Sequence, residues 1–513
     1  MVHDERPAGP NAVAVVFDDE RAVSDAGIVL VATLADRLGI EALAGRFVRL
    51  GDRVGAANPG CKLMSLVYAM VLGVDCIDDT DILRSGSTRK LLATRVAAPS
   101  TLGTFLRAFT FGHVRQLDRL LAELLKRAWA AGAGPGAGRL VIDVDSFVGE
   151  VHGYAKQGAS FGYTGKRGYH PLIATRAGSG EVLHVRFRKG AANTQRGMSR
   201  FCDELIARVR RAGATGPGLL RADSGFWNTK VFDKLHQKGW QFSIGVRMTK
   251  PVAKLVAAIP EDAWTRLEDY PETGEAQIAE TTLSGRRLIV RRVRLLSAQG
   301  ELFGGWRHFP FATNRTESIE LVEAEHRQHA VVEQVIADLK DQALTHFPSG
   351  DYDANAAWTV LACLAHNLLR WTTLIGLPDT VVRVARTMRR RLLRMPGRLT
   401  RTAPQVDAAP PRPLALAERL RRRAQTPPRA PRARLNPNPP GPEDQPQHAA
   451  LTGAITPGRT RRQRRPERPN PPPEPAQPPT RGPHSPTDDP EHRPRARQHP
   501  IHAPPPDGSV DPG

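Results

Sequence analysis

The chain has 513 residues and a formal net charge of +21, with 73 Lys and Arg against 52 Asp and Glu. This length allows several domains and a sizeable core, and the positive charge favours a polyanionic partner such as nucleic acid. The four cysteines are far apart and lack the spacing of a zinc site, which indicates a reduced, cytoplasmic protein. The longest apolar run, 63–74, is too short to cross a bilayer, and we expect neither a signal peptide nor a membrane partner.

Helical periodicity dominates the first quarter of the chain. We interpret residues 1–137 as a helical N-terminal domain, which either binds DNA or serves only for packing and dimerisation. The clearest helical segments are 32–38, 40–47, 62–71 and 105–129.

The pattern changes at Arg139, where short apolar runs alternate with helical stretches. This order predicts an α/β layer with a mixed sheet, of which 138–249 is the first part. Strand-like patterns at 250–312 predict a β-rich insertion, and helices resume at 313–380. The expected strands are 140–145, 168–175, 181–187, 218–223 and 241–246, and the expected helices are 196–212, 228–238, 318–342 and 354–375.

Positive charge is concentrated at the end of the chain. Residues 381–513 contain 26 Arg, no Lys and 11 acidic residues, together with 31 of the 44 Pro. Such a composition buries too little apolar surface to offset the conformational entropy of the chain. We expect a basic helical extension at 381–402 and a disordered Arg/Pro-rich tail at 403–513, which either binds a polyanion or is simply solvated.

Three acidic residues lie where a sheet enzyme presents catalytic groups. Asp145 is near the end of the first strand of the mixed sheet, Asp223 ends a second short apolar strand, and Glu333 lies on a later helix. Asp143 precedes Asp145 by two residues, so both side chains point to the same face of their strand. Either of the two aspartates can therefore fill the first position.

The glutamate belongs to a polar row on its helix. At about 100° per residue, His326, His329, Glu333 and Lys340 fall on one side, next to an apolar stripe. A carboxylate flanked by cations suits a metal-bound phosphodiester. Carboxylate oxygens favour Mg²⁺ or Mn²⁺ over zinc, so the three acids predict a site for two such ions. The alternative for each acid is a cap or a salt bridge.

Several ordered motifs resemble those of a known family. On these motifs the chain is similar to bacterial insertion-sequence transposases of the DDE class, in the subgroup with a Tyr-Arg-Glu-Lys signature (transposase DDE domain group 1). The similarity covers roughly residues 25–400. The motifs are 142–146 (Ile-Asp-Val-Asp-Ser), 168–172 (Gly-Tyr-His-Pro-Leu), 221–226 (Arg-Ala-Asp-Ser-Gly-Phe), 326–340, 355–358 (Asn-Ala-Ala-Trp) and 365–368 (Ala-His-Asn-Leu).

The resemblance implies an RNase H-like catalytic core with a β-rich insertion between the second Asp and the Glu. It also implies that Asp145, Asp223 and Glu333 bind the metal ions and catalyse phosphoryl transfer. Family members cut DNA at the terminal inverted repeats of an element and join the 3′-hydroxyls to target DNA. They act as homodimers on paired ends, so the expected partner is DNA and the expected location is the cytoplasm, at the bacterial nucleoid.

Two positions depart from the family signature, since its Tyr falls at His326 and its Arg at His329. A neutral His binds phosphate less well than the planar fork of Arg. An inactive DNA-binding relative, acting as a repressor or persisting as a relic, is therefore a second hypothesis, and a general RNase H-like nuclease is a third. The expected DNA contacts are Lys340, His326, His329, Arg327 and, for stacking on a flipped base, Trp306.

Overall fold

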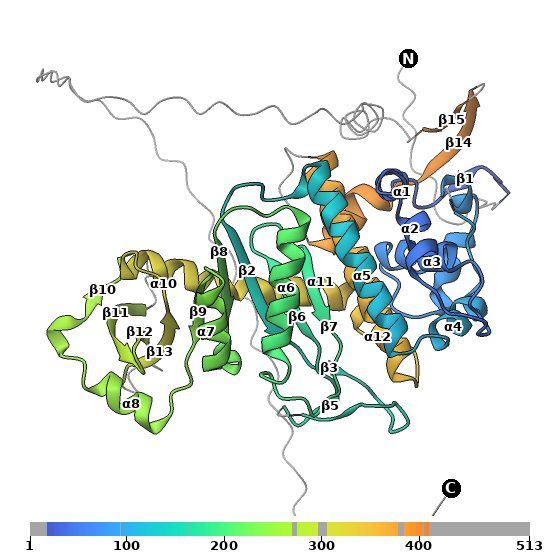
Figure 1. Ribbon diagram of the computed structural model, residues 1–513. Helices are drawn as coiled ribbons and strands as arrows, with labels where there is room; N and C mark the ends of the chain where they lie inside the picture. Colours follow the sequence, from blue (N-terminus) through green and yellow to red (C-terminus); the bar gives the residue numbers. More distant parts are fainter. Residues whose placement is uncertain are drawn as a thin grey trace, which may run out of the picture. The chain divides into compact units, whose positions relative to one another are not determined.

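Nine strands form the central sheet of the computed structural model (Figure 1). The structure describes residues 18–92, 94–162, 164–268, 274–295, 305–377, 384–402 and 405–409. Most of the Arg/Pro-rich tail expected at 403–513 thus lies outside the described residues. Within the described ranges, no helix has both the length and the hydropathy needed to cross a bilayer.

The strand order is β10-β11-β12-β13-β9-β8-β2-β6-β7. β2, β8 and β9 run parallel, whereas β6 is antiparallel to both β2 and β7. The predicted α/β class with a mixed sheet is confirmed, because short apolar strands are buried between helices on both faces. The strands of this half are β2 (Leu140–Ser146), β6 (Leu172–Arg176), β7 (Val182–Arg186), β8 (Gly218–Ala222) and β9 (Gln241–Gly245), and the helices beside them include α6 (Met198–Ala212) and α7 (Thr229–Gln237).

The β-rich region at 250–312 continues the same sheet. β13 pairs antiparallel with β9, with Ala312 opposite Ile244. Alternate residues of β12 face opposite sides, so Val290 packs with α8 (Lys250–Ala257) and Ile289 packs with α10 (Ile319–Arg327). The strands are β10 (Thr265–Arg266), β11 (Gly274–Leu283), β12 (Arg286–Leu295) and β13 (Arg307–Thr313).

The N-terminal helices share one hydrophobic core with the sheet. α12 (Tyr352–Trp371) is buried along almost its whole length, and it contacts both the N-terminal helices and β7. The boundary expected at residue 137 therefore does not separate two cores. The helices are α1 (Ile28–Arg37), α2 (Ile40–Phe47), α3 (Pro59–Val71), α4 (Pro99–Arg107) and α5 (Phe111–Ala128). A DNA-binding role for them stays a prediction.

The segment after α12 differs from the expected helix. Helical structure extends from α13 (Ala385–Met388) through η10 (Arg389–Leu393) and then stops. Pro396 lacks an amide hydrogen, and the chain beyond it forms strand β14 (Gly397–Thr402), which pairs with β1 (Ala22–Val23) and β15 (Gln405–Ala409). The prediction of helix up to 402 is thus wrong for 397–402, and 405–409 is a strand where disorder was expected.

A buried ion network holds α5 against α6 and β7. Arg208 of α6 binds Asp118 of α5, and His184 of β7 lies 3.4 Å from Asp118 Oδ1 and 3.1 Å from Glu204 Oε2. Burial alone would raise the pKa of Asp118, but Arg208 and His184 hold it well below its usual range. Burial likewise opposes ionisation of Glu204, whose pKa is nevertheless lowered to about 2 by His184 and Arg186.

We expect Asp118→Asn to lower the free energy of unfolding by about 3–5 kcal/mol near neutral pH, because Arg208 loses its charged partner. The stabilisation by Asp118 is present above its unfolded-state pKa of 3.8 and is lost as the pH falls towards the folded-state value. The difference in the free energy of unfolding between wild type and variant, measured by urea denaturation, should therefore shrink by about 1 kcal/mol from about pH 7 to about pH 3. A difference that does not depend on pH would contradict this account.

Candidate active site

Two of the predicted carboxylates come from neighbouring parallel strands. Val144 of β2 is in register with Ala222 of β8, so Asp145 and Asp223 follow as neighbours where the two strands end. Glu333 lies in the first turn of α11 (Val331–Leu339), which contacts β2. The negative charges of both Asp223 and Glu333 act on Asp145. The structure therefore brings the three predicted carboxylates together.

The two aspartates are poorly neutralised. Burial raises the pKa of Asp145 to about 6, and the nearby carboxylates add to this increase. Desolvation by the surrounding protein also raises the pKa of Asp223. This residue nevertheless reaches solvent, since it lines a cavity. Within the described part of the chain, neither aspartate has an ion pair, and each accepts only one backbone N–H. Asp145 accepts from Ser146 at 2.6 Å, and Asp223 accepts from Gly225 at 3.0 Å.

Asp143 has the opposite environment although it lies on the same face of β2. Its side chain is 1% exposed and accepts from Arg221 twice, with Nε–Oδ1 at 2.7 Å and Nη2–Oδ2 at 2.8 Å. His329 Nδ1 lies 3.1 Å from the same Oδ1. Because these partners occupy Asp143, Asp145 is the aspartate of β2 that retains free acceptor capacity.

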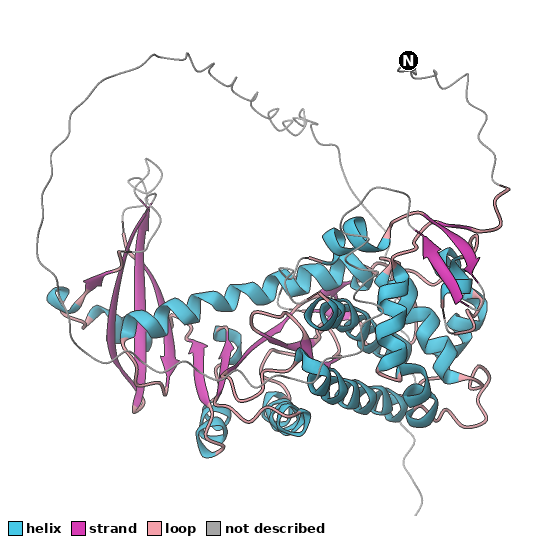
Figure 2. Ribbon diagram, turned by 90° about the horizontal axis from the view of Figure 1, so that it is seen from above, coloured by secondary structure: helices cyan, strands magenta, loops and turns pink. Residues whose placement is uncertain are grey.

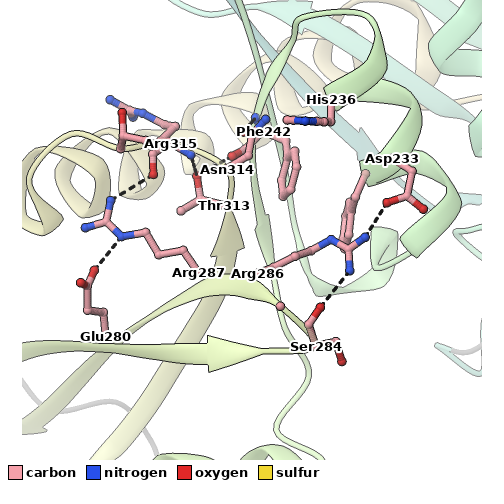
Figure 3. Close-up of a pocket in the computed structure, with 13 residues that line it drawn as sticks. Asp233, His236, Phe242, Glu280, Ser284, Arg286, Arg287, Thr313, Asn314 and Arg315 are labelled. Atoms are coloured by element: carbon pink, nitrogen blue, oxygen red, sulfur yellow. Dashed lines mark hydrogen bonds and ion pairs between the residues drawn. The ribbon is translucent and has the colours of Figure 1, made fainter.

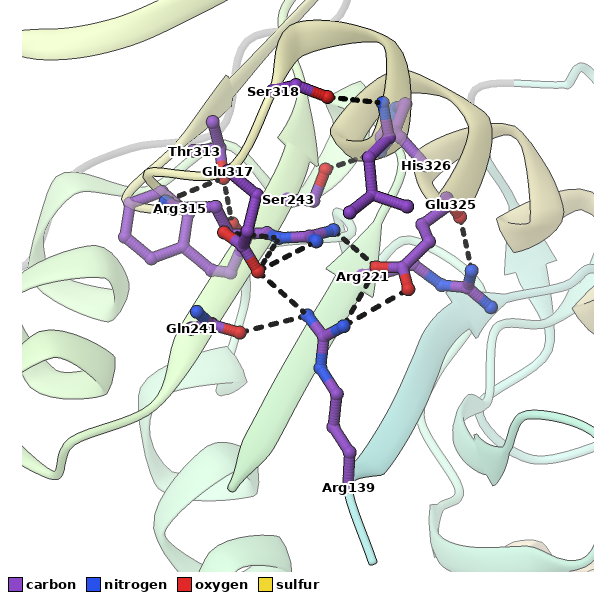
Figure 4. A network of polar contacts seen from close by, with 12 residues as sticks. Arg139, Arg221, Gln241, Ser243, Thr313, Arg315, Glu317, Ser318, Glu325 and His326 are labelled. Atoms are coloured by element: carbon purple, nitrogen blue, oxygen red, sulfur yellow. Dashed lines mark hydrogen bonds and ion pairs between the residues drawn. The ribbon is translucent and has the colours of Figure 1, made fainter. Parts of the chain in front are cut away.

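A buried polar network positions the helix that carries the third carboxylate. Arg221 donates to the backbone carbonyl of Glu325 near the end of α10 (Figure 4). The same guanidinium binds Asp143. Arg139, at the start of β2, and Arg315, just after β13, both bind the Glu325 carboxylate. α10 continues through a short turn into α11 as one long helix (Figure 2). Contacts at Glu325 therefore also determine where α11 lies.

The three carboxylates suit a hard divalent cation, because all their donor atoms are oxygens and neither aspartate has an ion-pair partner among the described residues. They are not as tightly gathered as a preformed single-ion site. In the described part of the chain, the group whose donor atoms all lie within 4.8 Å of one another is a different one, formed by Asp75, Cys76 and Asp79.

The two histidines on the polar row have different surroundings. The His326 ring stacks on Phe311 with centroids 4.1 Å apart, and its Nδ1 lies 2.8 Å from Ser243 Oγ. Burial lowers the pKa of His326 to about 3, so this side chain is neutral, and it lines the cavity beside Asp223 and Glu333. His329, which contacts Asp143, is close enough to lower the pKa of both Asp145 and Asp223.

Two other expected DNA contacts lie on either side of the carboxylates. Arg327 Nε is 3.0 Å from Glu323 Oε1, and its side chain lines the cavity that contains Glu333. Lys340 lies about two helical turns beyond Glu333. Its Nζ is 5.4 Å from the centre of the ring of Phe147, which follows β2.

Trp306 is not brought together with the carboxylates. The Arg292 guanidinium lies 4.4 Å from the Trp306 ring centre and 4.1 Å from that of Trp264. On β12, Arg292 points away from Arg291, which binds Glu323 on α10. Trp306 therefore lies on the α8 face of the sheet, whereas the carboxylates lie on the α10 face.

A cavity of about 530 Å³ opens between α10, α11 and β13, beside Asp223 and Glu333. It includes residues that the sequence analysis missed, notably the exposed Arg247 and Phe309. The available signal was that Arg247 follows β9, whose carboxyl end lies beside that of β8.

A larger cavity of about 690 Å³ lies between α7 and the β11–β12 turn (Figure 3). Two of its cations are paired, Arg286 with Asp233 and Arg287 with Glu280. It contains none of the predicted site residues and is not the catalytic candidate.

The sequence profile of the family described as "Transposase DDE domain group 1" matches residues 6–426. The chain belongs to this transposase family. The resemblance seen in the motifs is thereby confirmed at the level of the family. No curated protein matches the chain. Among solved structures, the cryo-EM structure of the piggyBac transposase synaptic complex with hairpin DNA has 12% identity and a TM-score of 0.42, covering 79% of this chain and 83% of that chain.

We expect Asp145→Asn and Asp143→Asn to change stability in opposite directions. The folded-state pKa of Asp145, about 6, exceeds its unfolded value of 3.8, so its ionisation disfavours folding as the pH rises through this range. Without divalent ions, the first substitution should raise the free energy of unfolding at about pH 7.5 by about 1–2 kcal/mol. Asp143→Asn leaves Arg221 buried without a charged partner and should lower the free energy of unfolding by about 3–5 kcal/mol.

Urea denaturation of both variants in EDTA measures these two changes. A loss of stability with both substitutions would contradict the separation of Asp143 from the site.

Proposed function

We propose that the protein is a DNA transposase that cuts the ends of a mobile element and joins their 3′-hydroxyls to target DNA. The observation that carries this proposal is the gathering of Asp145, Asp223 and Glu333, of which the two aspartates have raised pKa values, in a chain of the transposase family. The bacterial insertion-sequence origin and the Tyr-Arg-Glu-Lys subgroup rest on the motif resemblance.

The topology supports an RNase H-like assignment for the catalytic core. The order β7-β6-β2-β8-β9 contains one antiparallel strand, β6, among strands that run parallel to β2. The insertion enters after β9, between Asp223 and Glu333, as the resemblance implies.

In this proposal, Asp145, Asp223 and Glu333 hold one or two Mg²⁺ or Mn²⁺ ions. Such ions, when bound, activate the attacking oxygen and stabilise the leaving oxygen of the phosphodiester. The protein's own contribution is to place the carboxylates. The ends of β2 and β8 hold the two aspartates, and the contacts of Arg221 hold α10 and α11 over them.

Phosphate binding would fall to cations around the same face. Arg247 and Arg327 line the cavity at Asp223, and Lys340 lies beyond the end of β2. We infer that DNA, as terminal inverted repeats and as target, is the partner, and that a homodimer holds the paired ends in the cytoplasm at the nucleoid.

An inactive DNA-binding relative is the second candidate. It is favoured by the two signature positions, because His326 is packed and neutral and His329 is engaged by Asp143. Neither offers the bidentate phosphate contact of an arginine.

We expect Asp223→Asn and Glu333→Gln to lower strand joining with Mg²⁺ or Mn²⁺ by more than about 100-fold, because each removes a charged metal ligand. Binding to terminal-repeat DNA should change little. The matched control is Glu320→Gln, an exposed glutamate in the first turn of α10, which should leave joining unchanged.

Joining is measured with labelled terminal repeats, and binding by gel shift. Normal joining by both variants would reject the mechanism. Binding by the wild type without any nicking would favour the inactive relative.

A further inference from the structure

The hairpin of β2 and β6 continues beyond the first catalytic aspartate. Ser146 pairs with Leu172, and Gly149 pairs with Tyr169 in the same register, so one pair of strands extends the other. A third strand adds to this extension, and we call residues 149–162 and 164–169 the arm. The last residue of its first strand, Glu150, is at most about 17 Å along the chain from Asp145. The arm consists of β3 (Gly149–Glu150), β4 (Ser160–Phe161) and β5 (Arg167–Tyr169).

The base of the arm is firmly anchored. Tyr169 is buried, its hydroxyl accepts from Asn355 Nδ2 at 3.2 Å, and it donates to the carbonyl of Gln157 at 3.0 Å. A Cβ on Gly168 would lie 2.3 Å from the carbonyl oxygen of Gly149, so the two strands meet at a distance that only glycine permits. The arm is therefore a built element of the fold, placed by contacts with the core.

Two aromatic side chains on the arm are exposed, Tyr154 by 86% and Phe161 by 61%. The Arg167 guanidinium lies 5.3 Å from the centre of the Tyr154 ring and donates to the backbone carbonyls of Gly153 and Tyr154. The loop that carries this ring is thus held in place while its ring remains open to solvent. Exposed rings on a positioned loop are suited to stacking on a ligand.

Positive charge gathers beside these rings. Lys166 Nζ binds Glu150 Oε2 at 2.7 Å, and Lys340, in the turn η8 (Lys340–Leu344) after α11, is close enough to interact with both. Burial lowers the pKa of Lys340, and repulsion by Lys166 lowers it further, whereas Glu150 opposes the change. Lys166 and Lys340 share this one carboxylate, and Arg167 on the same arm contacts backbone carbonyls instead, which leaves a surplus of positive charge suited to phosphate groups.

We propose that the arm binds the unpaired DNA next to the cleavage point, with Tyr154 and Phe161 stacking on bases and Lys166 and Lys340 contacting phosphates. Rings combined with cations are typical of surfaces for single-stranded DNA, and a fully paired duplex exposes few base faces for stacking. This inference rests on the proposed function, because the ligand is the DNA substrate of the same site.

The test compares the full-length wild type with Tyr154→Ala and Phe161→Ala in fluorescence anisotropy without divalent ions. The probes are a terminal-repeat duplex with a 3′ single-stranded extension and the same duplex with a blunt end. Each substitution should weaken binding of the extended DNA by roughly 5- to 100-fold and of the blunt DNA by less than about 2-fold. Phe111→Ala, which removes a 65% exposed ring at the start of α5, is the matched control and should change neither.

Two further variants separate stacking from charge. Tyr154→Phe keeps the ring and should bind the extended DNA like the wild type. Lys166→Ala should lower the slope of log affinity against log salt by about 1 for the extended DNA, relative to the exposed control Lys254→Ala.

The inference is overturned if both alanine variants bind the extended DNA as tightly as the wild type, or if they lose equal affinity for both probes. In either case, joining by the wild type would leave the proposed function intact. A wild type that neither binds nor joins terminal-repeat DNA would instead reject the proposed function itself.

Discussion

The ion pair between Arg221 and Asp143 links the elements that carry the candidate site. Arg221 lies on β8, Asp143 lies on β2, and the same guanidinium reaches the carbonyl of Glu325 on α10. Both side chains are almost completely buried, so removal of either charge would leave the other uncompensated in a medium of low polarity. This contact therefore holds two strand ends and one helix in a single arrangement, and the position of Glu333 depends on it.

Acidic residues on this sheet and on the helix beside it fall into two electrostatic classes. Asp143 and Asp118 are buried and form ion pairs with Arg221 and Arg208, which stabilise the fold. Asp145 and Asp223 have no such partners in the described part of the chain, and burial opposes their charge. Such an arrangement costs stability in the free protein, and it is the expected cost of a site that is completed by a cation.

The continuous sheet also determines which side chains can act together. Because alternate residues of β12 and β13 point to opposite faces, the insertion has one side towards α10 and the carboxylates and another towards α8. Trp306 lies on the second side, between arginines, whereas Phe309 lies on the first side, in the cavity. The arm extends the β2–β6 hairpin in register, so exposed rings and lysines follow the strand that carries Asp145.

Local pattern in the sequence determined much of this protein. Short apolar strands ending in Asp145 and Asp223, and a helix with Glu333 in its polar row, were predictable because strand and helix periodicities depend on residues close in sequence. The choice between Asp143 and Asp145 was not, since both occupy the same strand face and only the distant Arg221 distinguishes them. The packing of His326, the face occupied by Trp306, the continuity of the insertion with the core sheet and the strand at 397–402 likewise depend on partners far away in the chain. Tertiary structure decided these points, because burial and charge pairing are set by neighbours that sequence spacing does not specify.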